Sequence, residues 1–373
     1  MNELENVIEH CRLKKSGYYN LTLFRDLGEN IIREFRKKIK WEEVSRSQEL
    51  SEKFIEEFKD KVDWELISRH QVLSEQFCEK HFDKINWYRI CVVSKFSEEF
   101  LNKHWNHLEH HDIWSNQKLS EKFIEKHIKD ANWHIISQRQ ILSEDFIRRH
   151  QDEVDWQTIC SCQILSEKFI EEFEDKVSWY CISKYQKLSE PFIEQYQDRV
   201  HWNVICEKQT LSEEFMRRYT DQLSWYAVSS CQNLSEQFID DFYHKLNWDA
   251  ISYKQKMSEE FMIKWKRRLN WTYIFSFQTV DENFVENKMD PWDIKWTELC
   301  QHQKLSEPFI RRHLDKINWG LISSQQNLSE EFCREFQDKI AWKQLLMYNK
   351  HSHLSEEFKN EMYNKYHKTH LYK

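Results

Sequence analysis

The chain contains few of the residues that make turns. Only three glycines and three prolines occur in 373 residues. Glycine supplies positive φ and proline presets the backbone of turns, so we expect few irregular loops. Aromatic residues make up 15% of the chain, with 17 tryptophans, and charged residues make up 32%. This composition is typical of ordered amphipathic elements and argues against general disorder.

The sequence also lacks a long apolar run. No stretch approaches the roughly 18 apolar residues that a membrane-spanning helix needs. The first residues, MNELENVIEHCRLKK, are charged and have no signal-peptide core. The formal net charge is −8, whereas proteins that wrap phosphate backbones usually carry a basic excess. We expect a soluble, cytoplasmic chain without a membrane partner, and we favour a protein partner over a nucleic acid, which a local basic face would still admit.

Sequence signatures of catalysis are missing as well. The ten cysteines have no zinc-finger or redox spacing, and the closest pair, Cys160 and Cys162, is too tight for a CxxC knuckle. There is no glycine-rich phosphate loop, no HExxH and no GxSxG motif. We therefore expect no enzyme, with no catalytic residues, no cofactor and no metal ion.

What the sequence does contain is a repeat, marked by tryptophan. The segment from Leu50 to Val72 reads LSEKFIEEFKDKVDWELISRHQV, and about fifteen related copies fill the chain. The period is 23 residues, with His110 at one tryptophan place and two extra residues before Trp296. The marker residues are Trp41, Trp64, Trp87, Trp133, Trp156, Trp179, Trp202, Trp225, Trp248, Trp271, Trp296, Trp319 and Trp342.

Each repeat reads as two short helices. Ser51 fits an N-cap, and Phe54 and Phe58 follow it on one helical face. Asp63 fits a second N-cap before Trp64, with further apolar residues at helical spacing behind it. Helices this short are marginal alone, so the repeats must stack to bury their apolar faces. The predicted fold class is all-α, an α-solenoid of about fifteen stacked two-helix repeats with degenerate capping units at both ends.

The repeat leaves no stretch long enough for another domain. We expect a single array over residues 1–373. Its parts are N-terminal degenerate or capping units (1–40), regular repeats (41–342), and a C-terminal cap with a basic tail (343–373).

Two segments of the array are irregular. In 88–117, His110 replaces tryptophan while Trp105 and Trp114 are additional. In 284–296, two extra residues accompany Trp292. We expect local kinks there, and irregular units in a regular array are candidate binding sites.

Three sets of repeated polar residues are candidates for catalysis, ligand binding or metal binding. The serine or cysteine after isoleucine in the second helix is best explained by a need for a small side chain. The repeated glutamine either satisfies backbone groups at the corner between repeats or forms a row of amides that contacts a ligand. The histidines at the Phe58 place, such as His81, would lie about 10 Å apart, too far to share a zinc ion, so packing is favoured.

The positions after each tryptophan are the natural place for specificity. They vary between repeats and fall on the exposed side of the second helix, as at Glu65 and His134. Together with the irregular units, they give the candidate partner-binding residues. These are Trp105, His110, Trp114, Trp292, Tyr88, Tyr180, Asn203 and Asp249.

The unit L-S-E-x-F-I…D-K-V-x-W-x-x-I-S-x-x-Q resembles the short tryptophan-containing helical repeats of proteins from large nucleocytoplasmic DNA viruses. The resemblance covers nearly the whole chain, and it implies a location in the host cytoplasm or the virion. It implies no activity and no catalytic residues. The two-helix unit is also similar in logic to longer tetratricopeptide-type repeats, which implies binding.

Three functions are compatible with these observations. The first is a non-enzymatic scaffold that binds protein partners, as yet unknown, along an exposed solenoid face. The second is a modular RNA-binding protein, by analogy with helical repeats that read one base per unit. The third is a virion component that self-associates.

Overall fold

The computed structural model describes residues 8, 27–349 and 353–367, and every regular element within them is a helix. The chain divides into two compact units, Met1–Gln186 and Lys187–Lys373, which consist of the same repeat. Within each unit, two-helix repeats stack in series, so the predicted α-solenoid class is confirmed. Parts of the predicted capping segments (1–7, 9–26, 350–352 and 368–373) lie outside the described residues.

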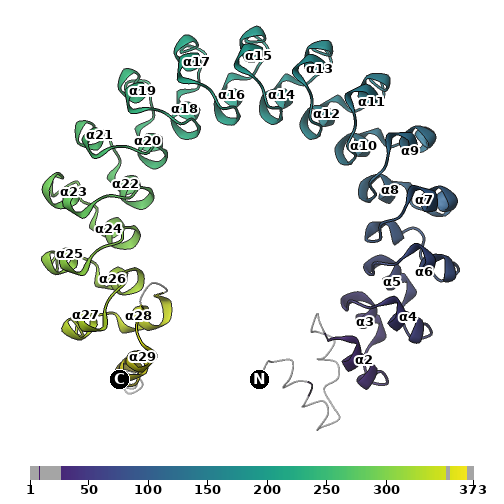
Figure 1. Ribbon diagram of the computed structural model, residues 1–373, viewed down its shortest axis with the longest axis horizontal. Coiled ribbons are helices and arrows are strands. Elements are labelled where there is room, and N and C mark those ends of the chain that lie inside the picture. The colour runs from purple at the N-terminus through teal and green to yellow at the C-terminus, as the bar shows by residue number, and fades with distance from the viewer. Residues whose placement is uncertain (1–7, 9–26, 350–352, 368–373) are drawn as a thin grey trace. The chain divides into compact units, whose positions relative to one another are not determined.

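We call the first helix of each repeat A and the second, which begins at the tryptophan place, B (Figure 1). The A helices of unit 1 are α2 (Glu29–Phe35), α4 (Glu52–Glu57), α6 (Glu75–Lys80), α7 (Glu98–His104), α9 (Glu121–Lys126), α11 (Glu144–Arg149) and α13 (Glu167–Glu172). Its B helices are α3 (Trp41–Ser47), α5 (Trp64–His70), α8 (His110–Asn116), α10 (Trp133–Arg139), α12 (Trp156–Cys162) and α14 (Trp179–Tyr185). Its 3-10 helices are η2 (Ile90–Val92), η3 (Trp105–His107) and η4 (Ile128–Asp130).

Unit 2 repeats this order. Its A helices are α15 (Glu190–Gln195), α17 (Glu213–Arg218), α19 (Glu236–Asp241), α21 (Glu259–Lys264), α23 (Glu282–Asn287), α25 (Glu307–Arg312), α27 (Glu330–Glu335) and α29 (Glu356–His367). Its B helices are α16 (Trp202–Lys208), α18 (Trp225–Cys231), α20 (Trp248–Lys254), α22 (Trp271–Phe277), α24 (Trp296–His302), α26 (Trp319–Gln325) and α28 (Trp342–Tyr348).

The predicted caps begin both helices of the repeat. In α4 the Ser51 hydroxyl accepts the N–H of Phe54 at 3.2 Å. In α5 the Asp63 carboxylate accepts the N–H of Glu65 at 3.0 Å. Each cap satisfies a backbone donor that has no partner inside its helix, which fixes where the helix starts.

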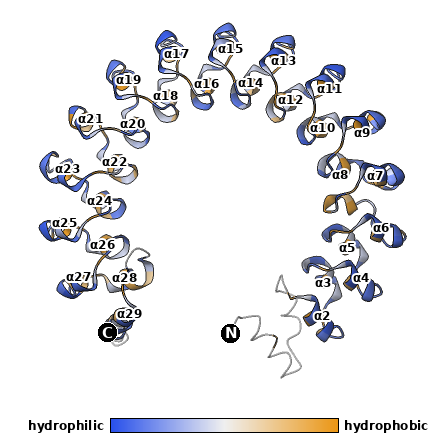
Figure 2. Cartoon of the chain, viewed as in Figure 1, coloured by the Kyte–Doolittle hydropathy of each residue, from blue (hydrophilic) through white to orange (hydrophobic). Residues whose placement is uncertain are grey.

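The A and B helices form two layers in each unit (Figure 1). Successive B helices pack directly on one another, and Phe54, Ile55 and Ile67 are among the fully buried side chains between the layers. The tryptophan of one repeat stacks on the next, as Trp64 does on Phe77 with ring centroids 6.1 Å apart. Figure 2 shows the A helices as strongly hydrophilic and the B helices as paler.

The repeated glutamine connects neighbouring repeats. Gln71 Nε2 donates to the carbonyl oxygens of Ser45 (3.3 Å) and Gln48 (2.7 Å) in the preceding repeat. Gln71 Oε1 accepts the N–H of Leu50 at 3.0 Å. One buried amide thus satisfies three backbone groups at a helix end that would otherwise lose hydrogen bonds. The prediction that this glutamine satisfies backbone groups at the corner is confirmed.

Two further polar residues of the repeat bridge neighbours. The Ser68 hydroxyl donates to the Trp64 carbonyl at 2.7 Å and accepts the N–H of Asn86, in the next repeat, at 2.9 Å. Glu52 accepts the N–H of Ser74, the N-cap of the next A helix, at 2.5 Å. The small residue in helix B is buried as predicted, but its hydrogen bonds between repeats were not predicted from its size.

The first irregular segment keeps the stacking but loses a helix. Residues 87–93 form turns around η2 where other repeats have a complete B helix. Ser94 replaces the glutamine and accepts the N–H of Leu73 at 3.0 Å. Gln117 then donates to the carbonyl of Ser94 at 2.8 Å, so the spacing of 23 residues continues through this segment.

The second irregular segment absorbs its extra residues in a loop. Between α23 and α24, residues 288–295 are not helical, and Lys266 pairs with Asp290 at 2.6 Å. Gln303 still donates to the carbonyl of Gln278 at 2.6 Å, now across 25 residues. The insertion lengthens the corner and leaves the bridging amide in place.

The C-terminal helix is longer than predicted. Part of the predicted basic tail is helical, because α29 runs to His367 and is twice as long as a regular A helix. Met362 is buried, and the ring of Tyr366 stacks on Trp342 at 4.8 Å. Residues 360–367 therefore cover the last B helix, because apolar residues at helical spacing lie within an otherwise polar segment.

The bridging amide can be tested in the middle of unit 1. We expect Gln163→Ala to lower the free energy of unfolding by about 2 kcal/mol or more, because three buried backbone groups lose their partner. Urea unfolding followed by circular dichroism measures the change. The matched control is Gln157→Ala, an exposed glutamine in the adjoining B helix, which should change stability by less than about 0.5 kcal/mol. Equal effects of the two variants would refute this role.

Candidate interaction surface

The repeated polar residues do not form a surface for a ligand. All repeated glutamines of unit 1, from Gln48 to Gln186, are buried. The hypothesis that this row of amides contacts a ligand is therefore wrong, because backbone groups occupy their donors and acceptors. The bridging serines, such as Ser68, are fully buried too. Any binding surface must consist of residues that vary between repeats.

The buried cysteines are poor nucleophiles. Burial raises the pKa of the Cys78 and Cys91 thiols to about 12, and that of Cys160 to about 11. A thiol reacts as its thiolate, so these groups are inert near neutral pH. Cys160 serves instead as a hydrogen-bond acceptor, since its sulfur accepts the N–H of Ser178 at 3.4 Å.

The histidines of the A helices pack as aromatic rings. His81 lies 4.8 Å from the Trp64 ring and 4.6 Å from the Phe77 ring, centroid to centroid. Its Nε2 lies 2.7 Å from a carboxylate oxygen of Glu56 in the preceding repeat. Within the described residues no group of three or more His, Cys, Asp or Glu could hold a metal ion. The packing interpretation is confirmed by these ring contacts.

The extra tryptophans of the first irregular segment lie in the interior. Trp105 stacks on His127 at 3.8 Å and lies 5.6 Å from Phe123. These are the two positions that a regular tryptophan contacts in the next repeat, as Trp64 contacts Phe77 and its histidine neighbour. Trp105 thus replaces the missing tryptophan.

The other two residues of this cluster support that replacement. His110 stacks on Trp105 at 4.1 Å and is half-buried. Trp114 is buried, and its indole N–H donates to the carbonyl of Asp130 at 3.1 Å. The prediction that Trp105 and Trp114 bind a partner must be corrected, because both rings are buried in packing, whereas a partner contact at the half-buried His110 stays a prediction.

The other candidates are exposed. Tyr88 is 66% exposed and Tyr180 is 46% exposed, and both follow the tryptophan of a repeat in unit 1. In unit 2, Asn203 and Asp249 hold the same position and are also exposed. Trp292 is 75% exposed but lies in the loop between α23 and α24, so it is separate from the B-helix row.

Sequence reasoning missed the most exposed apolar side chains. Ile141 is 90% exposed and Ile164 is 95% exposed, each just after the buried glutamine of its repeat. In unit 2, Tyr226, Tyr253 and Phe277 project from B helices, with the last two rings 4.7 Å apart. The signal lay in the repeat itself, since most other repeats place a polar residue (Lys, Asn, Thr or Glu) after the glutamine, and only Val72 shares the apolar character.

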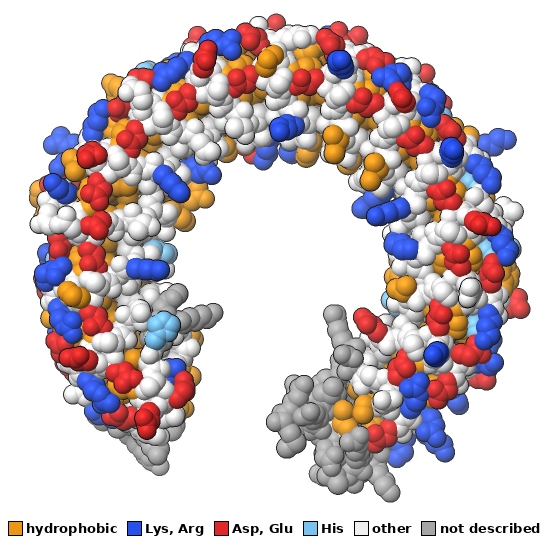
Figure 3. Space-filling model, viewed as in Figure 1, with side chains coloured by type: hydrophobic (Ala, Val, Ile, Leu, Met, Phe, Trp, Pro, Cys, Tyr) orange, Lys and Arg blue, Asp and Glu red, His pale blue; other side chains and the backbone are white. Residues whose placement is uncertain are grey.

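These residues define a B-helix face in each unit. It consists of the exposed side chains one, five, six and eight places after the tryptophan, together with Arg89 and Tyr273, which are exposed at the second place. Figure 3 shows Lys and Arg side chains with few Asp or Glu along the edges of the units where B helices lie. The A helices carry both signs densely (Figure 3). The variable and less charged B-helix face is the candidate interaction surface.

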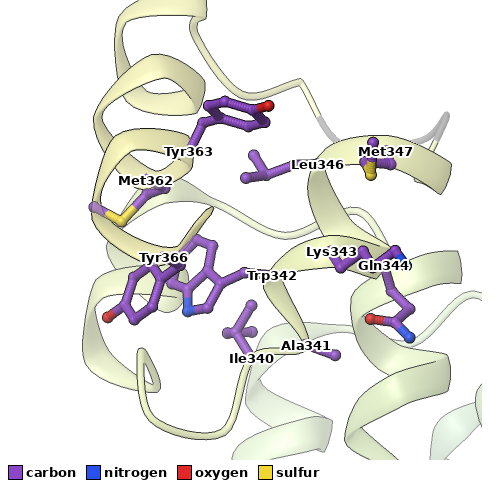
Figure 4. A pocket seen from close by; sticks show the side chains of 10 residues that line it. All are labelled: Ile340, Ala341, Trp342, Lys343, Gln344, Leu346, Met347, Met362, Tyr363 and Tyr366. Carbon is purple, nitrogen blue, oxygen red and sulfur yellow. The ribbon is translucent and has the colours of Figure 1, made fainter. Parts of the chain in front are cut away.

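A recess of about 470 Å³ lies between α28 and α29 (Figure 4). Leu346 and Met347 contribute from α28, and Met362 and Tyr363 from α29. Its walls are mostly apolar, and the polar side chains of Lys343 and neighbouring residues do not form a nucleophile with a base. The recess therefore provides apolar contact area rather than chemistry.

No protein-family model, no curated protein and no solved structure matches the chain. The resemblance to viral repeat proteins therefore stays a prediction. In the part of the chain that the structure describes, no helix has the length and apolar character to cross a bilayer.

The buried tryptophan cluster gives a test against its exposed counterpart. We expect Trp114→Ala to lower the free energy of unfolding by about 3–5 kcal/mol, because it leaves a large cavity. Trp292→Ala, the same change at an exposed position, should alter it by less than about 0.5 kcal/mol. Urea unfolding of both variants measures the difference, and similar small losses would contradict the packing role.

The carboxylates between A helices predict a pH dependence. Hydrogen bonds from Lys80 and His81 lower the pKa of Glu56 to about 2, and Lys103 and Arg149 lower the pKa of Glu79 and Glu125. In the unfolded chain these groups titrate near about 4.3.

Because their pKa values are lower when folded, these carboxylates stabilise fully above about pH 5 and lose that contribution as pH falls toward about 2. Urea unfolding at a series of pH values should show this decline, with a smaller slope in Glu56→Gln. A stability that rises across the same range would contradict it.

Proposed function

We propose that this chain is a non-enzymatic scaffold that binds protein partners along the B-helix face. The observation that carries the proposal is that the constant and the variable residues of the repeat have different roles. The constant polar residues form hydrogen bonds between repeats, whereas several variable residues project large apolar side chains into solvent. Exposed apolar groups on an otherwise polar surface are typical of protein-binding sites.

Several residues support this assignment in both units. Tyr88 and Tyr180 project from unit 1, and Tyr226, Tyr253 and Phe277 project from unit 2. Tyrosine and other aromatic side chains are enriched in the energetically dominant parts of protein interfaces. The inert cysteines and the lack of a metal-binding group within the described residues favour binding over catalysis. A cytoplasmic or virion location would suit such a scaffold and stays a prediction.

Crosslinking in an extract of the native cells tests the proposal. A photo-crosslinking phenylalanine derivative is placed at Tyr180 or Tyr226 on B helices, and at the exposed Lys168 or Glu214 on A helices as matched controls. We expect protein adducts from the B-helix positions in clear excess over the A-helix positions.

Each other outcome of this experiment contradicts the proposal in a recognisable way. Adducts that ribonuclease removes would favour RNA binding. An adduct between two copies of this chain would favour self-association. Equal adduct yields at the A- and B-helix positions would mean that the B-helix face is no special surface.

A further inference from the structure

The charge of the B-helix face of unit 1 changes along the chain. Its first two repeats are acidic, with Glu42, Glu43, Glu49 and Glu65, whereas the part from Trp87 to Gln186 is basic. Between Trp87 and Gln186 its B segments contain five cationic side chains and a single carboxylate, Asp112. Asp112 is buried, so it contributes little to the exposed surface. The cations are Arg89, Lys95, Lys118, Arg139 and Lys184. A chain with a net charge of −8 therefore has a positive stretch, from Trp87 to Gln186, on the B layer of this unit.

The two layers also differ in how their charges are used. On A helices, cations pair with carboxylates of neighbouring repeats, as in Lys103–Glu79 at 2.6 Å and Arg148–Glu172 at 2.7 Å. On the B-helix face, Arg89 lies 3.9 Å from Asp112, whereas Lys118 and Arg139 have no ion-pair partner among the described residues. Their charge is thus available to a carboxylate from outside, which a neutralised pair would not be.

Apolar side chains lie among these free cations. Ile141 follows Arg139 by two residues, and Ile164 occupies the same place in the next repeat. Tyr180 and Tyr185 flank Lys184, whose Nζ lies 5.0 Å from the Tyr185 ring centroid. Covering side chains as exposed as Ile141 and Ile164 would remove apolar area from water, which favours association.

The repeat spacing suggests the form of the occupant. Packed helices lie about 8–10 Å apart, so Ile141 and Ile164 should be separated by a similar distance. One turn of polyproline II, which is three residues, rises about 9 Å. An extended segment with an apolar side chain at every third residue would therefore match consecutive repeats.

We infer that the part of the B-helix face between Trp87 and Gln186 binds an acidic, extended segment of a partner protein, with apolar side chains at intervals of three residues. This inference rests on the proposed function and specifies its partner. The aliphatic side chains of Ile141 and Ile164 favour a protein segment, because they offer no stacking platform for bases. The exposed rings of Tyr180 and Tyr185 would accept bases, so the test includes an RNA probe. The cations supply orientation and the apolar contacts supply the binding energy.

Fluorescence anisotropy with the full chain tests the inference. The probe is a labelled peptide of about six polyproline II turns that repeats Leu-Glu-Pro. The matched probes repeat Leu-Gln-Pro and Leu-Lys-Pro, and an oligouridylate of similar length represents RNA. At low salt, about 50 mM, we expect the acidic peptide to bind at least about tenfold more tightly than the others, and to weaken as salt increases.

Variants of unit 1 assign the effect to the face. Lys118→Glu with Arg139→Glu should weaken the acidic peptide by about tenfold, since both free cations become like charges. Ile141→Ser with Ile164→Ser should weaken it comparably at every salt concentration. The control is Lys122→Glu with Lys168→Glu, the same charge change on exposed A-helix positions, which should leave binding within about twofold. Circular dichroism checks that each variant is folded.

Several results would overturn the inference. These are equal affinity for the neutral peptide, tighter binding of the oligouridylate, no binding of the acidic peptide at low salt, or equal losses in the A- and B-helix variants. Each of them leaves the crosslinking test of the scaffold intact. If crosslinking recovers proteins while the acidic peptide does not bind, the proposed scaffold function is retained. Only the inferred acidic, extended partner segment is then rejected.

Discussion

One buried amide per repeat determines how the repeats stack. A B helix of seven residues ends with carbonyl groups that have no partner within the helix. The glutamine of the following repeat accepts one backbone N–H and donates to two of those carbonyls, as Gln71 does with Leu50, Ser45 and Gln48. The same bonds would be lost if a neighbouring repeat moved by one helical residue. The amide therefore fixes the register between repeats as well as satisfying the backbone.

This constraint explains which positions are free to evolve toward binding. The glutamine, the small residue in helix B, the N-terminal glutamate of helix A and the tryptophan all bond across or within repeats. Substitution of the glutamine or the small residue leaves a buried polar group without a partner, substitution of the tryptophan leaves a cavity, and substitution of the glutamate removes an exposed bond between repeats. Many positions between them on helix B face solvent, and where they bond to the next repeat, as Asp249 does to Asn270, the bond is exposed. Tyrosine, isoleucine, lysine or asparagine can therefore occupy them. Structure and function thus occupy different residues of the same short helix.

The irregular segment at 88–117 shows how the constraint tolerates a change. The tryptophan place holds His110, and an indole from five residues earlier, Trp105, fills the space instead. Sequence spacing alone identified an anomaly there and favoured a binding role. Only the packing showed that Trp105 replaces the missing tryptophan, because side chains from different sequence positions can fill the same space. The insertion near Trp292 is absorbed differently, by a longer corner that keeps the Gln303 bond.

The sequence by itself determined the helical class, the two-helix repeat and its caps, because apolar periodicity and cap residues act within a few residues of each other. It also placed Tyr88, Tyr180, Asn203 and Asp249 correctly on the surface, because the residue after the tryptophan points away from the apolar side of the repeat. Only the tertiary structure decided which polar side chains form hydrogen bonds between repeats and which face solvent. Whether a glutamine meets a carbonyl or solvent, or a tryptophan fills a neighbour's space, depends on contacts between residues more than 20 positions apart. Those contacts have no local signature, and they separate the residues that hold the repeats together from those left to bind a partner.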